Sequence, residues 1–108
     1  MVEFRETALF TRRIIQLLSD DEYAKLQHVL ALDPATGDLI SGTRGLRKLR
    51  WHHADRGKGK RGGIRVIYYW HSKGSLVYML LAYSKGEQDD LTPREKRLLS
   101  ALVTEEFK

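Results

Sequence analysis

Nine of the residues from Arg44 to Arg65 are lysine or arginine, and a glycine-rich loop interrupts this basic stretch. The segments on either side of the loop, RGLRKLRW and IRVIYYW, have strand-like sequences. A block with so many like charges repels itself and lowers stability unless an anionic partner compensates it. We therefore interpret the rest of the chain as a small scaffold that holds this stretch against something anionic.

The distribution of charge supports the same interpretation. Residues 41–74 carry ten basic side chains and one acidic side chain, a balance of +9, whereas the segments before and after them have balances of −3 and −1. A basic run is often no more than a solvated surface. A block this concentrated between mildly acidic flanks instead indicates nucleic acid or another polyanion as the partner.

Length and composition limit the class of protein. A chain of 108 residues with 42% hydrophobic residues predicts one domain, spanning residues 1–108, with a modest core. The absence of cysteine excludes disulfides, thiolate zinc sites and cysteine catalysis. The N-terminal sequence lacks the pattern of a signal peptide, and the apolar runs are too short to span a membrane. We expect a soluble, cytoplasmic protein that does not associate with membranes.

Capping signals predict three helices. Thr7 caps a first helix with apolar residues at helical spacing, and Ser19 with Glu22 forms the capping box of a second. Pro34 ends the second helix, so the two form a helical hairpin with one apolar face. Thr92 begins a final helix in the sequence TPRE, which has proline at the first helical position and glutamate in the capping box.

Alternation predicts the strands. We expect a short strand from Val2 to Arg5, and three longer ones spanning 46–51, 64–70 and 76–83. The element order is then strand, helix, helix, three strands, helix, which indicates an α+β fold with an antiparallel sheet. Period-two alternation places Lys48 and Arg50 on one face of their strand and groups Arg65 with Ile67 and Tyr69. Tyr68, Tyr69 and Trp70 are interpreted as core and sheet-packing residues.

Several kinds of site are excluded by spacing. His52 and His53 are adjacent on a strand and point to opposite faces, so they cannot chelate one ion, and we expect no metal site. No serine lies near a His–Asp pair in a recognisable turn, so a nucleophilic triad is not expected. The glycines near residue 60 do not match GxxxxGK[ST], although they would let the backbone approach a phosphate closely.

The remaining groups suit RNA. Lysine and arginine neutralise phosphates, and tyrosine and tryptophan can stack on unpaired bases. The same groups could cleave RNA without a metal or other cofactor, because arginines can stabilise the charge that develops when the ribose 2′-OH attacks the adjacent phosphate. A lysine crowded by like charges loses basicity and becomes a plausible general base. Composition alone does not separate a nuclease from an RNA-binding protein.

Three segments resemble a known family: GLRKLRW, then GKGKRGGIRVIYYW, then a strand ending in LLAYSKGEQDDLT. Together they resemble the RelE/ParE superfamily of bacterial toxins, and within it the HigB-like branch. The resemblance covers nearly the whole chain. It implies a helical hairpin packed on a small twisted antiparallel sheet, with a C-terminal helix and a concave basic face. It also implies a ribosome-dependent messenger RNA endoribonuclease, held inactive by an antitoxin that has a helix-turn-helix domain.

The resemblance also implies roles for individual residues. Arg65 and Arg50 would stabilise the phosphorane, Lys48 would be the general base, and Lys85 or Tyr83 would assist the leaving group. Further contacts to RNA would come from Arg47, Lys58, Lys60 and Arg61.

Two other functions stay open at this level. A ParE-like protein would share the fold but poison DNA gyrase, and a third possibility is an RNA-binding regulator without catalysis. The concentration of basic residues on the strands favours RNA over gyrase, because a gyrase-binding protein has no need of a phosphate-facing basic cluster.

Overall fold

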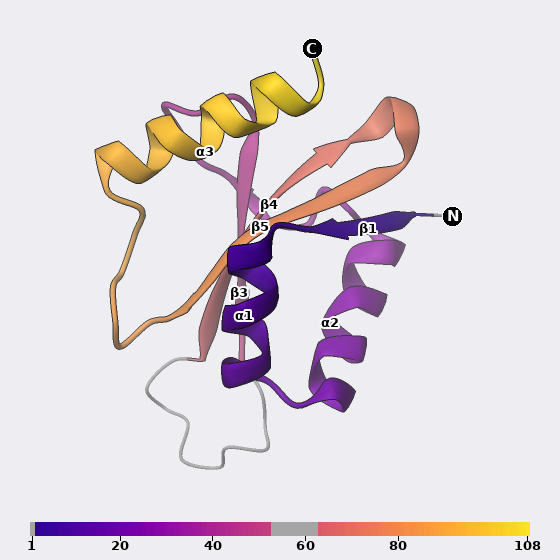
Figure 1. Cartoon of the computed structure of the whole chain (residues 1–108). Coiled ribbons are helices and arrows are strands. Elements are labelled where there is room, and N and C mark those ends of the chain that lie inside the picture. The colour runs from indigo at the N-terminus through magenta and orange to yellow at the C-terminus, as the bar shows by residue number, and fades with distance from the viewer. Residues whose placement is uncertain (1, 53–62) are drawn as a thin grey trace.

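A computed structural model describes residues 2–52 and 63–108 of the chain (Figure 1). A single 3₁₀ turn, Ser72–Gly74, joins the last two strands. The helices and strands in chain order are β1 (Glu3–Glu6), α1 (Ala8–Leu17), α2 (Asp20–Leu32), β2 (Asp38–Leu39), β3 (Leu46–Trp51), β4 (Ile64–His71), β5 (Leu76–Ser84) and α3 (Pro93–Glu106).

In the described residues, the strands form one five-stranded sheet in the order β1-β5-β4-β3-β2. The α+β prediction is confirmed. All neighbouring strands from β2 to β5 are antiparallel, whereas β1 runs parallel to β5 and makes the sheet mixed. The parallel pair arises because β1 reaches the sheet before the helical hairpin and pairs with the last strand of the chain. The two-residue β2 was not predicted.

Helices cover both faces of the sheet (Figure 1). The hairpin of α1 and α2 packs Phe10, Ile14 and Leu26 against one face, which carries Val66 and Met79. Helix α3 covers the other face, where Val103 and the sheet residues Leu46, Ile67 and Tyr83 form a second core. Because adjacent strand residues point to opposite faces, each side chain of β3 and β4 belongs to one layer or the other.

The predicted helix starts are confirmed. The side-chain oxygen of Thr7 accepts a hydrogen bond from the backbone N–H of Phe10, and that of Ser19 accepts one from Glu22. At α3 both halves of the capping box are present, with Thr92 and Glu95 bonded reciprocally. These bonds satisfy backbone donors that have no partner within the first turn of a helix.

An irregularity in β5 shifts its alternation. Ile67 of β4 pairs with Leu81 and the next residue, Tyr68, pairs with Met79, so Leu80 is an extra residue in β5. Leu80 and Leu81 consequently both contact the core under α3. Beyond this bulge Tyr83 faces α3, whereas uninterrupted alternation from Tyr78 would have turned it toward α1 and α2.

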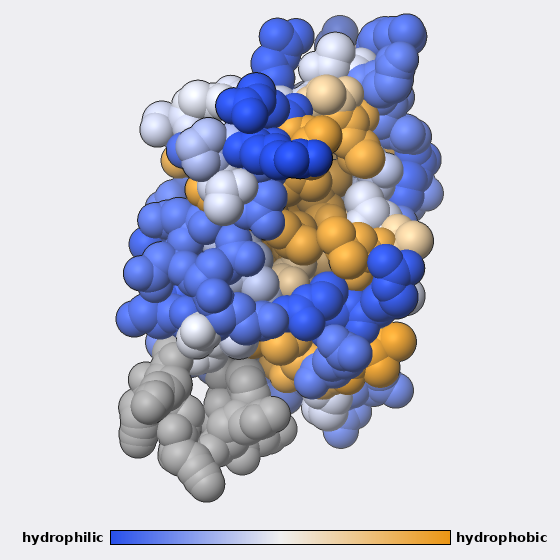
Figure 2. Space-filling model, turned by 60° about the vertical axis from the view of Figure 1, so that its left-hand side comes forward, coloured by the Kyte–Doolittle hydropathy of each residue, from blue (hydrophilic) through white to orange (hydrophobic). Residues whose placement is uncertain are grey.

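Part of the apolar surface stays exposed. Leu99 and Val103 of α3 pack against the core on this face of the sheet, whereas Leu98 and Leu102 of the same helix are exposed. Figure 2 shows an apolar stripe running between polar areas of the surface. Among the described residues, the large apolar side chains left exposed are Leu9, Ile15, Leu32, Leu39, Leu98 and Leu102. None of the helices in the described ranges is long and apolar enough to cross a membrane.

Candidate functional site

Three predicted site residues form one row across the sheet. Arg50 of β3 pairs with Arg65 of β4, and Arg65 pairs with Tyr83 of β5. Tyr83 belongs to the core under α3, so the row lies on the α3 face of the sheet. Lys48 lies two residues before Arg50 on the same strand and therefore on the same face. The structure thus brings Lys48, Arg50, Arg65 and Tyr83 together.

The row passes from the interior to the surface. Tyr83 is 2% exposed and Arg65 is 7% exposed, whereas the side chain of Arg50 is 51% exposed. A buried arginine keeps its charge, so it creates a strong positive potential in a region of low dielectric. An anion that binds at Arg50 would approach this buried charge. Such an arrangement suits stabilisation of a doubly charged phosphorane.

The Tyr83 hydroxyl is buried without a hydrogen-bond partner among the described residues. Burial is the largest cause that raises its pKa to about 12, and the negative charge of Asp90 adds to this effect. The positive charge of Arg65 acts in the opposite direction. The phenol therefore keeps its proton at neutral pH.

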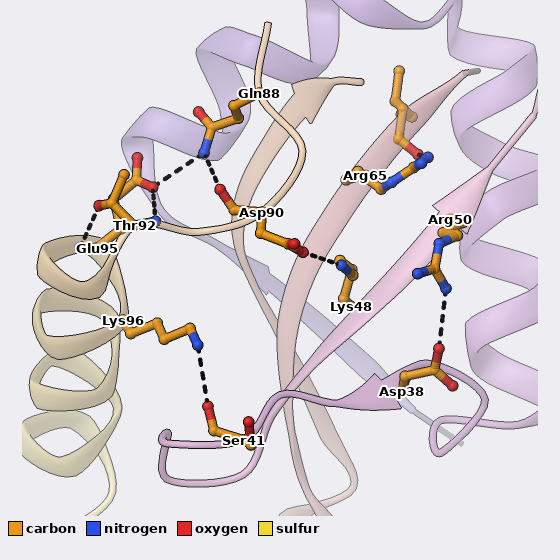
Figure 3. Close-up of polar contacts among 11 residues, drawn as sticks. Asp38, Ser41, Lys48, Arg50, Arg65, Gln88, Asp90, Thr92, Glu95 and Lys96 are labelled. Carbon is orange, nitrogen blue, oxygen red and sulfur yellow. Dashed lines mark hydrogen bonds and ion pairs between the residues drawn. The ribbon is translucent and has the colours of Figure 1, made fainter. Parts of the chain in front are cut away.

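Two carboxylates pair with the basic residues of β3 (Figure 3). Lys48 Nζ lies 2.5 Å from Asp90 Oδ1, and Arg50 Nη1 lies 3.1 Å from Asp38 Oδ2. The hydrogen bond and charge of Lys48 lower the pKa of Asp90. Both carboxylates are mostly exposed, so an incoming phosphate could replace them as the partner of each cation.

Local contacts fix the position of Asp90. Gln88 Nε2 donates to the backbone oxygen of Asp90 at 3.0 Å and to Glu95 Oε1 at 3.1 Å (Figure 3). Glu95 is itself part of the capping box of α3. The start of α3 therefore anchors the segment that carries Asp90 beside Lys48.

Arg47 lies on the opposite face of β3. Its Nη1 donates to the backbone oxygens of Ala35 at 3.0 Å and Gly37 at 2.7 Å. These bonds join β3 to the segment that follows α2. The structure thus separates Arg47 from the row, and its predicted contact with RNA stays a prediction.

The remaining predicted residues lie at or beyond the strand ends. Lys85 is exposed immediately after β5, and its backbone N–H donates to Gly63 O at 3.2 Å, next to the start of β4. His52 is exposed after β3. The predictions for His53, Lys58, Lys60 and Arg61 lie outside the described residues.

Sequence reasoning missed Asp38, Asp90 and Lys96, which line a hollow together with Lys48 and Arg50. Asp90 is 42 residues from Lys48 in the chain, so spacing gives no signal for their contact. The one available signal is the charge pattern: acidic residues next to strand and helix ends are suitable partners for a basic strand.

The comparison with known proteins agrees with this architecture. A chain of the intact E. coli RelBE toxin–antitoxin complex matches with a TM-score of 0.58, covering 76% of this chain and 94% of that chain. The chain has a RelE-like fold. The two sequences are 12% identical, so this similarity concerns the architecture alone. The activity depends on the residues of the site. No protein-family model matches the chain. The assignment to the HigB-like branch stays a prediction.

Proposed function

We propose that this protein is the toxin of a toxin–antitoxin pair and acts as a ribosome-dependent endoribonuclease on messenger RNA. The observation that carries the proposal is the row of Arg50, Arg65 and Tyr83 on one face of the sheet, with Lys48 beside it. The RelE-like fold supports it, since the similar chain comes from a toxin–antitoxin complex.

The proposed reaction uses side chains of the chain itself. The ribose 2′-oxygen attacks the adjacent phosphorus, a new P–O2′ bond forms and the P–O5′ bond breaks. Arg50 and Arg65 stabilise the charge on the non-bridging oxygens. One side chain accepts the 2′-OH proton, and another gives a proton to the leaving 5′-oxygen. The products are a 2′,3′-cyclic phosphate and a free 5′-hydroxyl.

The proposed proton donor is Tyr83, because its phenol lies opposite Arg65 in the row and carries a proton at neutral pH. Lys85 is exposed at the same end of β5 and is the alternative donor. Lys48 is the proposed base. Since Lys48 donates to Asp90, it must leave that contact and give up a proton before it can accept one from the 2′-OH.

The proposal includes two macromolecular partners and a compartment. The ribosome would present messenger RNA to the exposed Arg50, which places the protein in the cytoplasm. A cognate antitoxin with a helix-turn-helix domain would hold it inactive. We expect a small helix-turn-helix reading frame beside the gene. Its product should form a stable complex with the protein and block cleavage.

Expression without the antitoxin tests the proposal directly. We expect translation to stop and transcripts to be cut within codons, and Arg65→Ala to lower cleavage by roughly 10²–10³-fold. Arg97→Ala, an exposed arginine of α3, is the matched control and should cleave normally. Because Arg65 is buried, the melting temperature and antitoxin binding of both variants must be measured alongside.

The other functions predict different results. DNA breaks with continued translation would establish gyrase as the target. Binding to ribosomal or messenger RNA without any cut, in the wild-type protein, would establish a non-catalytic regulator.

A further inference from the structure

A small hollow of about 360 Å³ lies beside the row, bounded by β2, β3 and the start of α3. Its charged lining consists of three cations, Lys48, Arg50 and Lys96, and two carboxylates, Asp38 and Asp90. Figure 3 shows these side chains converging from separate elements, with Lys96 Nζ on the backbone oxygen of Ser41. The hollow therefore offers anion-binding groups and hydrogen-bond acceptors together.

The hollow also has an apolar wall. Leu39, Ile40 and Leu91 contribute to its lining, and Leu39 is 63% exposed. An apolar wall provides a surface against which a flat ring can pack. Volumes of about 300–1,000 Å³ are usual for small-molecule sites, so this hollow has room for one nucleotide and for little more.

We propose that the hollow binds one nucleotide of the RNA and selects a base with an exocyclic amino group over uracil. Adenine, cytosine and guanine each present an N–H₂ donor that a carboxylate can accept, as Asp and Glu do from cytosine N4. Uracil has no amino group: its one donor, N3–H, is flanked by two carbonyl oxygens, which Asp38 and Asp90 repel. This inference rests on the proposed function, because it takes RNA to be the substrate.

The carboxylates keep the capacity to read a base while they hold the cations. The ion pair with Lys48 uses Oδ1 of Asp90, and the pair with Arg50 uses Oδ2 of Asp38. An ionised carboxylate accepts several hydrogen bonds through two oxygens. The ion pairs therefore orient each carboxylate, and the positive excess of the lining accommodates the phosphate of the same nucleotide.

The position of the hollow links it to the proposed reaction. Lys48 and Arg50 line it, and Arg50 is also the exposed end of the row. A base in the hollow therefore belongs to a nucleotide that adjoins the phosphate at Arg50 and Arg65. Base selection in the hollow would then decide which phosphodiester bonds are cut.

The inference is tested by titrating the full-length protein with AMP, CMP, GMP and UMP. Binding is followed through the amide NMR shifts of Ile40 and Ser41. We expect the three amino-bearing nucleotides to bind roughly tenfold more tightly than UMP. Asp90→Asn should lower this preference, because an amide both accepts from an amino group and donates to a uracil oxygen. Asp89→Asn changes an exposed neighbour outside the lining and should retain the preference.

Three results would overturn the inference. They are equal affinity for all four nucleotides, no binding at these amides, and an identical effect of Asp89→Asn and Asp90→Asn. The titration involves no cleavage, so its result does not depend on catalysis. Cleavage of messenger RNA without base preference would refute base selection by the hollow but not the proposed endoribonuclease activity. Selective nucleotide binding without any cleavage would refute the proposed endoribonuclease activity but not the nucleotide site.

Discussion

Tyr83 stands directly opposite Arg65 on the neighbouring strand, and its buried hydroxyl has no hydrogen-bond partner among the described residues. Removing such a hydroxyl costs little stability, because no hydrogen bond is lost. We expect Tyr83→Phe to unfold at the same urea concentration as the wild type at pH 7, yet to cut RNA roughly 10²–10⁴-fold more slowly. Tyr69→Phe, on the same face of the sheet, is the control and should retain activity. Full activity of Tyr83→Phe would transfer the donor role to Lys85.

Tyr83 should also contribute to the alkaline limit of stability. Its pKa rises from 10.0 to about 12 on folding, so the folded state favours the neutral phenol. The resulting stabilisation is complete below about pH 10 and is lost as the pH rises toward about 12. Chemical denaturation across this range should therefore show a shallower loss of unfolding free energy in Tyr83→Phe than in the wild type. Equal slopes would contradict the shift.

Arg47 and Arg50, three residues apart on β3, should separate stability from function. Arg47 donates to two backbone oxygens, so Arg47→Ala should lower the free energy of unfolding by about 1–3 kcal/mol. The ion pair of Arg50 is exposed, so Arg50→Ala should cost less than about 1 kcal/mol. Only Arg50→Ala should lower the salt dependence of RNA binding, by about one unit of slope. A similar loss of slope in Arg47→Ala would support its sequence-based assignment to RNA.

Gly63 should be essential where β4 begins. It has φ +60°, and a Cβ at this position would lie 2.1 Å from the backbone oxygen of Trp51. Gly42 has φ +79° but nothing within 4 Å of a Cβ, so Gly42→Ala measures backbone strain alone, about 1–2 kcal/mol. Gly63→Ala should cost at least about 1–3 kcal/mol more, because the strand ends must move apart. Equal melting temperatures of the two variants would contradict this steric argument.

Phe107 should hold the end of α3 on the sheet. Its ring stacks on His71 with a centroid separation of 4.4 Å, lies 5.3 Å from Tyr69 and meets Tyr78 edge-on. Because Phe107 is only half-buried, we expect Phe107→Ala to cost about 2 kcal/mol, less than the roughly 3–5 kcal/mol of a fully buried phenylalanine. Amide exchange in the last turn of α3 should quicken. Leu98→Ala, an exposed site on α3, should leave that exchange unchanged.

Local signals predicted most of the fold. Hydroxyl groups at Thr7, Ser19 and Thr92 satisfy the first backbone donors of each helix, and this chemistry acts within one helical turn. Alternation along β3 and β4 likewise grouped Lys48 with Arg50, and Arg65 with Ile67 and Tyr69, because the strand period is fixed by backbone geometry. The parallel pairing of β1 with β5 was not predicted, since it depends on how the helical hairpin packs.

The sequence by itself therefore determined the helix starts, the main strands and the alternation that puts Lys48 and Arg50 on one face of their strand. Only the tertiary structure decided what stands beside them. The bulge at Leu80 turns Tyr83 into the row of Arg65, and the start of α3 carries Asp90 to Lys48. Both outcomes depend on packing between segments far apart in the chain. The contact energy there comes from the partner element, so the local spacing of residues does not predict it.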